Sequence, residues 1–385
     1  MNDKKTVLAL SLGHFAVDIF SSAIVPLYPY LVKKLGITLA TISFIIALAH
    51  LMSSMMQPLF GFLADKTRHR FFMFWGLAIS TIFIPLAMTS NSVYLLAIFF
   101  IIGVGGNALF HPQVTTLINV FTQNNSNLSK YMGIFLGAGT IGYAIAPMVS
   151  SSIVEYLGIN WVFLFSFVGL VSIVLLYMTV PKIPTESVTK DKTPFLPIMK
   201  KIFSSKKMIN LTYISVVKSF VSMSCATYFP FILARHGFSL SQTGLIITLF
   251  FANAGVATML SSKIEKIMGV RNLIKMAFVV ILPLTILFLN LLDYSRIFAV
   301  ILFILMGFFV FLSVSVTVVL AQRFMPEHKG VVSGVTQGFS WGIAAILIAP
   351  LGILAQNVSI ESALYLTAFI SFVTGLFFVS RDLEY

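Results

Sequence analysis

Two side chains in the first apolar segment of the chain could do acid–base chemistry. Asp18 lies inside the run from Thr6 to Leu31, and His14 stands one helical turn before it. A carboxylate within a hydrocarbon-spanning helix is costly unless it faces water or a partner, so its presence there indicates a functional site. Asp18 and His14 are therefore the first candidates for binding and releasing a proton.

Lys218, in the second half of the chain, is a basic counterpart to this acid. At 1.5 Å per residue, Asp18 lies about 18 Å from Thr6, and Lys218 lies about 15 Å from Met208, where its own apolar segment begins. Both helices carry polar residues at three- and four-residue steps. These are Ser11, His14, Asp18 and Ser21 or Ser22 on the first, and Ser215, Lys218, Ser222 and Cys225 on the other. Since lipid cannot satisfy polar groups, both stripes are expected to line a central cavity, and the common depth favours a pair.

The pair of Asp18 and Lys218 admits three interpretations. Asp18 could alternately bind a proton and release it, with its affinity tuned by burial and by Lys218 or His14. The two residues could instead form a fixed ion pair that joins two helices. Lys218 could also anchor an anionic substrate, because a desolvated ammonium attracts phosphonate or carboxylate strongly.

Polar and aromatic residues on other apolar segments are further candidates for a substrate site. Asn107 and His111 share one helix face, and His111 could contact either substrate or proton or serve only as a hydrogen-bonded structural residue. The remaining candidates are Gln113, Tyr28, Tyr143, Tyr228, Gln337 and Trp341. Taken singly, the tyrosines, Gln337 and Trp341 are typical of ordinary packing or of anchoring at the membrane interface.

Neither a metal ion nor another cofactor is expected. His14, Asp18, His50 and His111 could be combined into a metal site, but they come from three helices and lack local ligand spacing. A membrane-embedded enzyme would need a nucleophile with its base or a metal motif, and the sequence has neither. We therefore expect a protein that is not an enzyme.

The elements that position these residues are membrane helices. Of the 385 residues, 58% are hydrophobic and 10% are charged, and the mean hydropathy is +0.99. A helix needs about 20 apolar residues to span the bilayer. Twelve such segments begin near Thr6, Leu39, Arg70, Val93, Leu128, Asn160, Met208, Leu240, Asn272, Arg296, Lys329 and Ile360. The fold expected is an all-α, multi-pass membrane protein.

The net charge of +13 is explained by topology. With the N-terminus inside, most of the 25 lysines and arginines fall in cytoplasmic loops, as the positive-inside rule requires. Both termini are then cytoplasmic, and we expect a monomer in a cell membrane, specifically a bacterial inner membrane. Nucleic-acid binding is not expected, because the bases are spread over many loops without interleaved aromatics. The single cysteine, Cys225, excludes a disulfide framework within the chain.

The chain divides into two similar halves. Residues 181–207, rich in proline and charge, read as a cytoplasmic linker between a six-helix bundle at 1–180 and another at 208–385. At a constant offset of 201 residues, Pro29 falls on Pro230, and the run Thr38 to Ile46 falls on Ser239 to Ile247. Such weak internal symmetry is typical of transporters built from repeats, with their sites near the midplane between the halves.

The loop GFLADKTRHR between the second and third segments resembles the signature of the major facilitator superfamily. Gly61, Asp65 and Arg70 match its glycine, acid and base, while Arg68 and His69 replace a usual Gly and Arg. The resemblance implies two pseudo-symmetric six-helix bundles. It also implies a latch, made by Asp65 and Arg70 with a helix dipole, that holds one conformation.

Four further elements resemble the fosmidomycin resistance protein branch of that superfamily. They are SLGHFAVD, LYPYL, GNALFHPQ and the spacing of Lys218 and Tyr228. Gln113 stands where related sequences often carry Glu. This resemblance covers essentially the whole chain and implies alternating access.

The function expected is proton-coupled export of a small anionic or amphipathic compound, either a fosmidomycin-like drug or a native metabolite. The direction of transport, export rather than import, is inferred mainly from the resemblance. The glycine-rich run of the fifth helix, which resembles an exporter signature, supports it. Standard multidrug exporters carry an arginine in the fourth helix, and here the region reads Phe99, Phe100, Ile101. Alternatives are proton symport that imports an organic anion, export of a siderophore or metallophore, and a membrane receptor or scaffold. The partners expected are thus the substrate, protons and the lipid bilayer.

Overall fold

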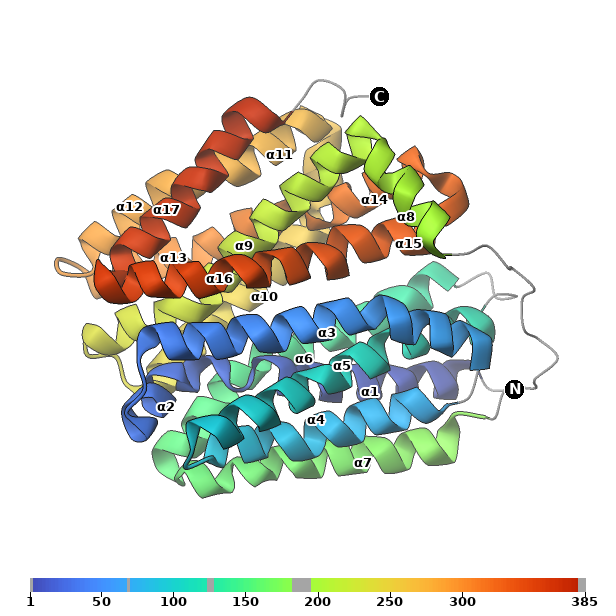
Figure 1. The fold of residues 1–385 in the computed structure, drawn as a ribbon, viewed down its shortest axis with the longest axis horizontal. Helices are drawn as coiled ribbons and strands as arrows, with labels where there is room; N and C mark the ends of the chain where they lie inside the picture. The colour runs from blue at the N-terminus through green and yellow to red at the C-terminus, as the bar shows by residue number, and fades with distance from the viewer. Residues whose placement is uncertain (1–2, 68–69, 123–127, 182–194, 380–385) are drawn as a thin grey trace. The chain divides into compact units, whose positions relative to one another are not determined.

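The computed structural model describes residues 3–67, 70–122, 128–181 and 195–379 (Figure 1). Of a few residues inside the helices, 61–67 among them, it describes only the backbone. Within this part of the chain, twelve helical segments are long and apolar enough to cross a membrane. The expected all-α, twelve-span architecture is confirmed.

The first six spans use seven α-helices and two short 3₁₀ turns. They are α1 (Asp3–Ser22), η1 (Val25–Leu27), α2 (Tyr28–Leu35), α3 (Leu39–Thr67), α4 (Phe71–Thr89), α5 (Val93–Thr122), α6 (Leu128–Tyr156), η2 (Ile159–Phe163) and α7 (Leu164–Thr179). The helix α8 (Phe195–Ser204) follows, inside the segment expected to be a linker, of which 182–194 lie outside the described residues.

The last six spans are more often interrupted. They are α9 (Lys206–Arg235), α10 (Leu240–Met268), α11 (Val270–Val279) with α12 (Ile281–Leu291), α13 (Arg296–Leu312) with α14 (Val314–Phe324), the series η4 (Pro326–His328), α15 (Lys329–Gly334), η5 (Val335–Phe339) and α16 (Ser340–Asn357), and α17 (Ile360–Val373) with η6 (Thr374–Phe378). Both η5 and η6 are π-helical turns.

The first span is longer than the sequence predicted, and it is broken. The run expected to be one helix from Thr6 to Leu31 becomes a span from Lys4 to Leu35, in which α1 ends at Ser22 and a 3₁₀ turn precedes α2. Pro26 lies in that turn. Because proline has no N–H to donate to the preceding turn, it interrupts the helical hydrogen-bond ladder at this point.

Close contacts divide the chain into two compact units. Unit 1 comprises Met1–Ile37, Leu48–Asp191 and Ser239–Thr248, and unit 2 comprises Thr38–Ala47, Lys192–Phe238 and Leu249–Tyr385. Each unit therefore contains the first turns of one helix, α10 or α3, whose remaining length belongs to the other unit. The predicted domain boundaries at 180 and 208 stay a prediction.

These first turns are held in the same way in both units. In unit 2 the backbone N–H of Ala40 donates to Oε1 of Gln356 at 3.1 Å, and in unit 1 that of Ser241 donates to Oε2 of Glu155 at 2.6 Å. Both donors and both acceptors are separated by the offset of 201 residues found in the sequence. The internal repeat thus extends to individual hydrogen bonds.

The first turns of α10 cross α6, and the first turns of α3 cross α16, and both helix crossings depend on small residues. A β-carbon on Gly244 of α10 would stand 1.8 Å from Oγ of Ser151, and one on Gly352 of α16 would stand 2.4 Å from Cβ of Ser43. Ser43 and Gly244 are repeat counterparts, as are Ser151 and Gly352. Each crossing therefore pairs one glycine with one serine, in opposite order, and this lets the helix backbones approach closely.

Candidate functional site

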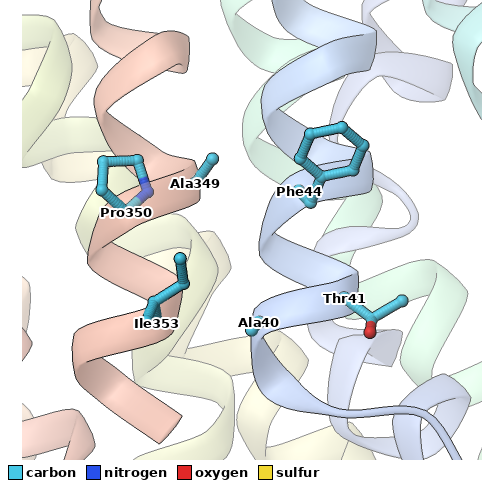
Figure 2. Close-up of a pocket in the computed structure, with 6 residues that line it drawn as sticks. All are labelled: Ala40, Thr41, Phe44, Ala349, Pro350 and Ile353. Atoms are coloured by element: carbon cyan, nitrogen blue, oxygen red, sulfur yellow. The ribbon is translucent and has the colours of Figure 1, made fainter. Parts of the chain in front are cut away.

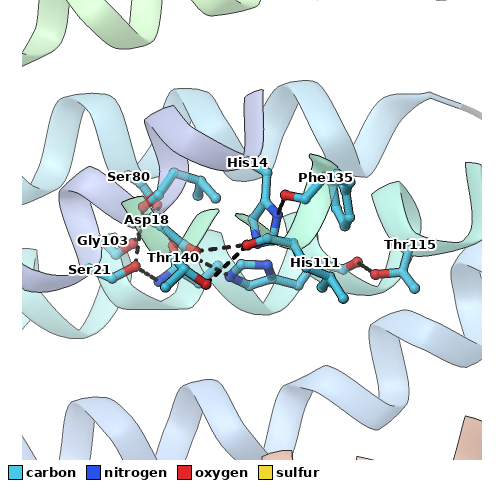
Figure 3. Close-up of polar contacts among 12 residues, drawn as sticks. His14, Asp18, Ser21, Ser80, Gly103, His111, Thr115, Phe135 and Thr140 are labelled. Atoms are coloured by element: carbon cyan, nitrogen blue, oxygen red, sulfur yellow. Dashed lines mark hydrogen bonds and ion pairs between the residues drawn. The ribbon is translucent and has the colours of Figure 1, made fainter. Parts of the chain in front are cut away.

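The carboxylate of Asp18 lies between two imidazole rings in unit 1 (Figure 3). Its Oδ2 is 3.3 Å from Nε2 of His14, one turn earlier on α1, and its Oδ1 is 3.3 Å from Nε2 of His111 on α5. The two rings meet edge to face, with centroids 5.1 Å apart. We call His14, Asp18 and His111 the acid–base cluster.

The other ring nitrogen of His14 is held by the backbone. Nδ1 lies 2.9 Å from the carbonyl oxygen of Phe135 on α6, and the ring stacks on the Phe135 ring with centroids 4.2 Å apart. Since a carbonyl can only accept, Nδ1 carries the hydrogen. The exchangeable position of His14 is therefore Nε2, which faces Asp18.

Exposure changes along the cluster. The side chain of His111 is 30% exposed, that of Asp18 is 15% exposed and that of His14 is 8% exposed. His111 is thus the end through which a proton or a solute can reach the carboxylate, while His14 is the closed end. The sequence left the role of His111 open, and its position beside Asp18 favours contact with a proton.

Helix α6 closes one side of the cluster with glycines. A β-carbon on Gly139 would stand 2.5 Å from Nε2 of His14 and 2.6 Å from Oδ2 of Asp18, and one on Gly142 would stand 2.3 Å from the carbonyl of Phe15. Those distances are too short for any side chain, so α1 and α6 approach through bare backbone. The glycine-rich run could be recognised in the sequence, but nothing in the sequence indicated that the Phe135 carbonyl would accept a hydrogen bond from His14.

Asn107 lies in a hydrogen-bond network beside the cluster. Its Nδ2 donates to Oγ of Ser21 at 2.6 Å, and its Oδ1 accepts from Oγ of Ser80 at 3.3 Å, which also donates to the carbonyl of Gly103. These bonds join α1, α4 and α5 (Figure 3). Asn107 therefore braces the helices that carry Asp18 and His111, and its predicted contact with substrate stays a prediction.

Gln113 is buried and serves the start of α4. Its Oε1 accepts a hydrogen bond from the backbone N–H of Met73 at 2.5 Å, in the first turn of that helix. The first N–H groups of a helix lack partners within it and need such an acceptor. Gln113 thus has a structural role at the start of α4, and its predicted contact with substrate stays a prediction.

Lys218 belongs to unit 2, in α9. Its residue is 6% exposed, and among the described residues its ammonium has no hydrogen-bond or ion-pair partner. In its own unit Asp18 is paired with the two histidines, so the predicted pairing of Asp18 with Lys218 stays a prediction. The spans that carry these two residues are the most buried of the twelve, at 72% and 89%, as expected for polar stripes that avoid lipid.

The remaining candidates for substrate contact are divided between the units. Tyr28, at the start of α2, and Tyr143, on α6, are in unit 1, where the Tyr143 carbonyl accepts from Ser22 at 2.6 Å. The Tyr228 hydroxyl lies 3.2 Å from Oγ of Ser43 and is buried, and the predicted contact of Tyr28, Tyr143 and Tyr228 with substrate stays a prediction.

Gln337 and Trp341 lie at the π-helical turn of unit 2. Gln337 is exposed within η5, and Trp341 is half-buried in the first turn of α16. Single π-helical turns inside helices are frequently found at functional sites. This turn favours Gln337 over the tyrosines as a residue that meets a ligand.

Part of the predicted latch can be placed. The Arg70 guanidinium donates to the carbonyl of Val180, at the end of α7, and lies 5.8 Å from the centre of the Phe74 ring. A cation is favoured at a helix C-terminus. The surroundings of Gly61 and the side chain of Asp65 lie outside what the structure describes.

Three of the four residues considered as metal ligands do meet. The ligand atoms of His14, Asp18 and His111 lie within 4.8 Å of one another, whereas His50 packs against Phe100. We expected no metal site because these residues lie on separate helices, but the packing of the helices brings their ligand atoms together. The absence of a resident metal stays a prediction.

An apolar groove of about 470 Å³ lies between α3 and α16 in unit 2 (Figure 2). Its lining consists of Ala40, Thr41, Phe44, Ala349, Pro350 and Ile353. It contains no charged side chain, so it offers nothing to an anionic substrate.

Comparison with known proteins covers nearly the whole chain. Residues 10–350 match the sequence profile of the Major Facilitator Superfamily. The fosmidomycin resistance protein of Escherichia coli is 24% identical over 372 residues, which are 94% of this chain and 89% of that protein. The uncharacterized MFS-type transporter YfnC of Bacillus subtilis is 24% identical over 373 residues, 94% and 90% of the two chains. A mutant of the nucleoside transporter NupG has a similar fold, with a TM-score of 0.80, 16% identity and coverage of 97% and 98%.

Proposed function

Because the chain belongs to the Major Facilitator Superfamily and is a multi-pass secondary transporter rather than an enzyme, we propose that it exports a small anionic or amphipathic compound in exchange for protons. The similarity to a fosmidomycin resistance protein supports a compound of that kind. We place the protein in a bacterial inner membrane as a monomer with both termini in the cytoplasm.

The observation that carries the proposal is the position of Asp18 between two imidazoles. A carboxylate flanked by two Nε2 atoms can hold a proton on either side of it, as Nε2–H to Oδ. A proton that enters binds Nε2 of His111, the exposed end, and passes to the carboxylate. The Nδ1–H bond to Phe135 keeps Nε2 of His14 turned toward the same carboxylate.

Gain or loss of one proton changes the net charge of a nearly buried group. In a membrane interior that charge difference is expensive, so the protonated and deprotonated forms favour different surroundings. A transporter that alternates between two conformations can therefore be driven by a proton gradient through this cluster, since each conformation prefers one protonation state.

The test is Asp18→Asn in proteoliposomes, with fosmidomycin as the probe. Asparagine has similar size and cannot take up a proton. We expect exchange of labelled for unlabelled probe to continue while transport driven by an imposed pH gradient is lost. The matched control is Asp293→Asn, which removes a carboxylate that is 76% exposed. Gradient-driven transport that is unchanged in Asp18→Asn would contradict the proposal.

A further inference from the structure

Helix α9 buries a cation without a counter-charge in its own unit. Lys218 is 6% exposed, and no described residue forms an ion pair or hydrogen bond with its ammonium. An ammonium removed from water loses several kcal/mol of hydration that only a partner of opposite charge or hydrogen-bond acceptors can offset. An anion that binds beside this lysine would therefore offset the cost of burying its charge.

Hydroxyl groups next to this lysine are unsatisfied as well. Serine in a helix usually donates to the carbonyl four residues earlier. Ser215 and Ser224 of α9 do so, at 2.9 and 2.7 Å. The hydroxyls of Ser219 and Ser222 are buried and have no hydrogen-bond partner among the described residues. These two unsatisfied hydroxyls thus lie within four residues of Lys218 on α9, and Thr212 and Ser313 are further buried hydroxyls without a hydrogen-bond partner in the described part of the chain.

Lys218 and Ser222 lie on one face of the helix. Residues four apart in an α-helix are neighbours, about one turn from each other. One face of α9 thus carries an ammonium and a hydroxyl, which are both hydrogen-bond donors. An oxyanion is bound by hydrogen-bond donors of these two kinds.

The depth of this face excludes a lipid headgroup at the membrane surface. Lys218 lies about 18 Å along the helix from Lys206 and about 25 Å from Arg235 at 1.5 Å per residue, so it is far from both ends of the span. A phosphate or carboxylate that reaches it from outside the protein must belong to a small molecule that enters the protein.

We propose that Lys218 and Ser222 form the subsite for an oxyanion, the phosphonate or carboxylate group of the transported compound. This rests on the proposed function, which supplies the transported compound. The ammonium attracts the charge, and the Ser222 hydroxyl donates to one of its oxygens. Unit 2 thus selects the charged end of the substrate, while the acid–base cluster of unit 1 handles protons.

The test measures binding without any proton gradient. Purified protein is titrated with methylphosphonate, and separately with acetate, at constant ionic strength, and the shift of its melting temperature gives the affinity. The neutral ester dimethyl methylphosphonate serves as a probe of the same shape without charge. We expect stabilisation by one or both anions and none by the ester.

Two variants and two controls then assign the site. Lys218→Met should weaken anion binding at least about 30-fold, since loss of one partner of a buried charge pair has a cost of this size. Ser222→Ala should weaken it about tenfold, and Ser224→Ala, whose hydroxyl is used within the helix, should leave it unchanged. Lys263→Ala removes a lysine near the end of α10 and should also have no effect.

Several results would overturn the site. They are the absence of any anion-dependent shift in the unmodified protein, unchanged binding in Lys218→Met, equal losses in Ser222→Ala and Ser224→Ala, and stabilisation by phosphatidylglycerol but not by methylphosphonate. The result is separable from proton coupling, because Asp18→Asn should bind the anions normally. If the unmodified protein binds anions normally but shows no transport driven by a pH gradient, the anion site is supported and the proposed proton coupling is refuted.

Discussion

Gly139 lies so close to His14 that a β-carbon at position 139 would stand 2.5 Å from Nε2 of the histidine. At this position helix α6 therefore meets the acid–base cluster through its backbone, while the Phe135 ring, one turn earlier, stacks on His14. The absence of a side chain keeps Nε2 of His14 and the Asp18 carboxylate within reach of each other.

Gly139→Ala should destabilise the protein by about 1–3 kcal/mol, the usual cost of overpacking, and should abolish gradient-driven transport by displacing His14. The measurement is thermal unfolding in detergent together with transport in proteoliposomes. Gly137→Ala is the matched control on the same helix, because a β-carbon there meets nothing within 4 Å. Equal effects of the two substitutions would show that the cluster is not under steric control from α6.

Gln113→Leu should lower stability by about 1 kcal/mol, because the Met73 N–H loses its acceptor at the start of α4. Gln113→Glu keeps the acceptor and adds a negative charge at a helix N-terminus, so it should be as stable as the unmodified protein or more stable. Thermal unfolding of the three proteins at neutral pH decides this. If Gln113 instead mainly binds substrate, Gln113→Leu would reduce affinity for the probe while leaving the melting temperature unchanged.

Gly244→Ala should destabilise the protein by about 1–3 kcal/mol, because the new methyl group would overlap Oγ of Ser151. Ser151→Gly in the same chain should restore part of that loss by removing the clashing hydroxymethyl group, while the Pro147 carbonyl oxygen remains 2.4 Å from the new β-carbon. Gly352→Ala with Ser43→Gly should show a fuller recovery, because both of the closest atoms there belong to the Ser43 side chain. Melting temperatures of the single and double variants form two double-mutant cycles, and additive losses in both would refute the pairing.

Glu327 lies outside the membrane spans and is hydrogen-bonded by Lys201. This bond holds the pKa of the Glu327 carboxyl below its usual value of 4.5. A carboxyl whose pKa is lowered by folding stabilises the protein above its ordinary pKa, and that contribution disappears as the pH falls through the lowered value. The melting-temperature difference between the unmodified protein and Glu327→Gln should therefore be present at pH 7 and vanish in acid. High salt should also reduce it, because both groups are exposed. A difference that persists in acid would contradict this account.

The fold class could be predicted from the sequence, because each membrane span needs a long apolar run. The twelve apolar runs correspond to the twelve helical segments that can span a membrane. Asp18 and His14 were found for the same reason, since a polar residue in such a run is conspicuous. The partnership of Asp18 with His111 could not be predicted, because it depends on how α1 and α5 pack. Neither could the Phe135 carbonyl be found, since every residue carries one. The break near Pro26 was missed because the run remains apolar across it.

The two crossings that pair a glycine with a serine also bear on how the chain can be divided experimentally. A fragment that ends in the linker lacks Ser239–Thr248, which packs in unit 1, and the complementary fragment lacks Thr38–Ala47, which packs in unit 2. Neither fragment therefore contains a whole compact unit. Co-expressed halves must exchange these two segments before either is complete, so assembly of the split protein is coupled to the folding of both fragments.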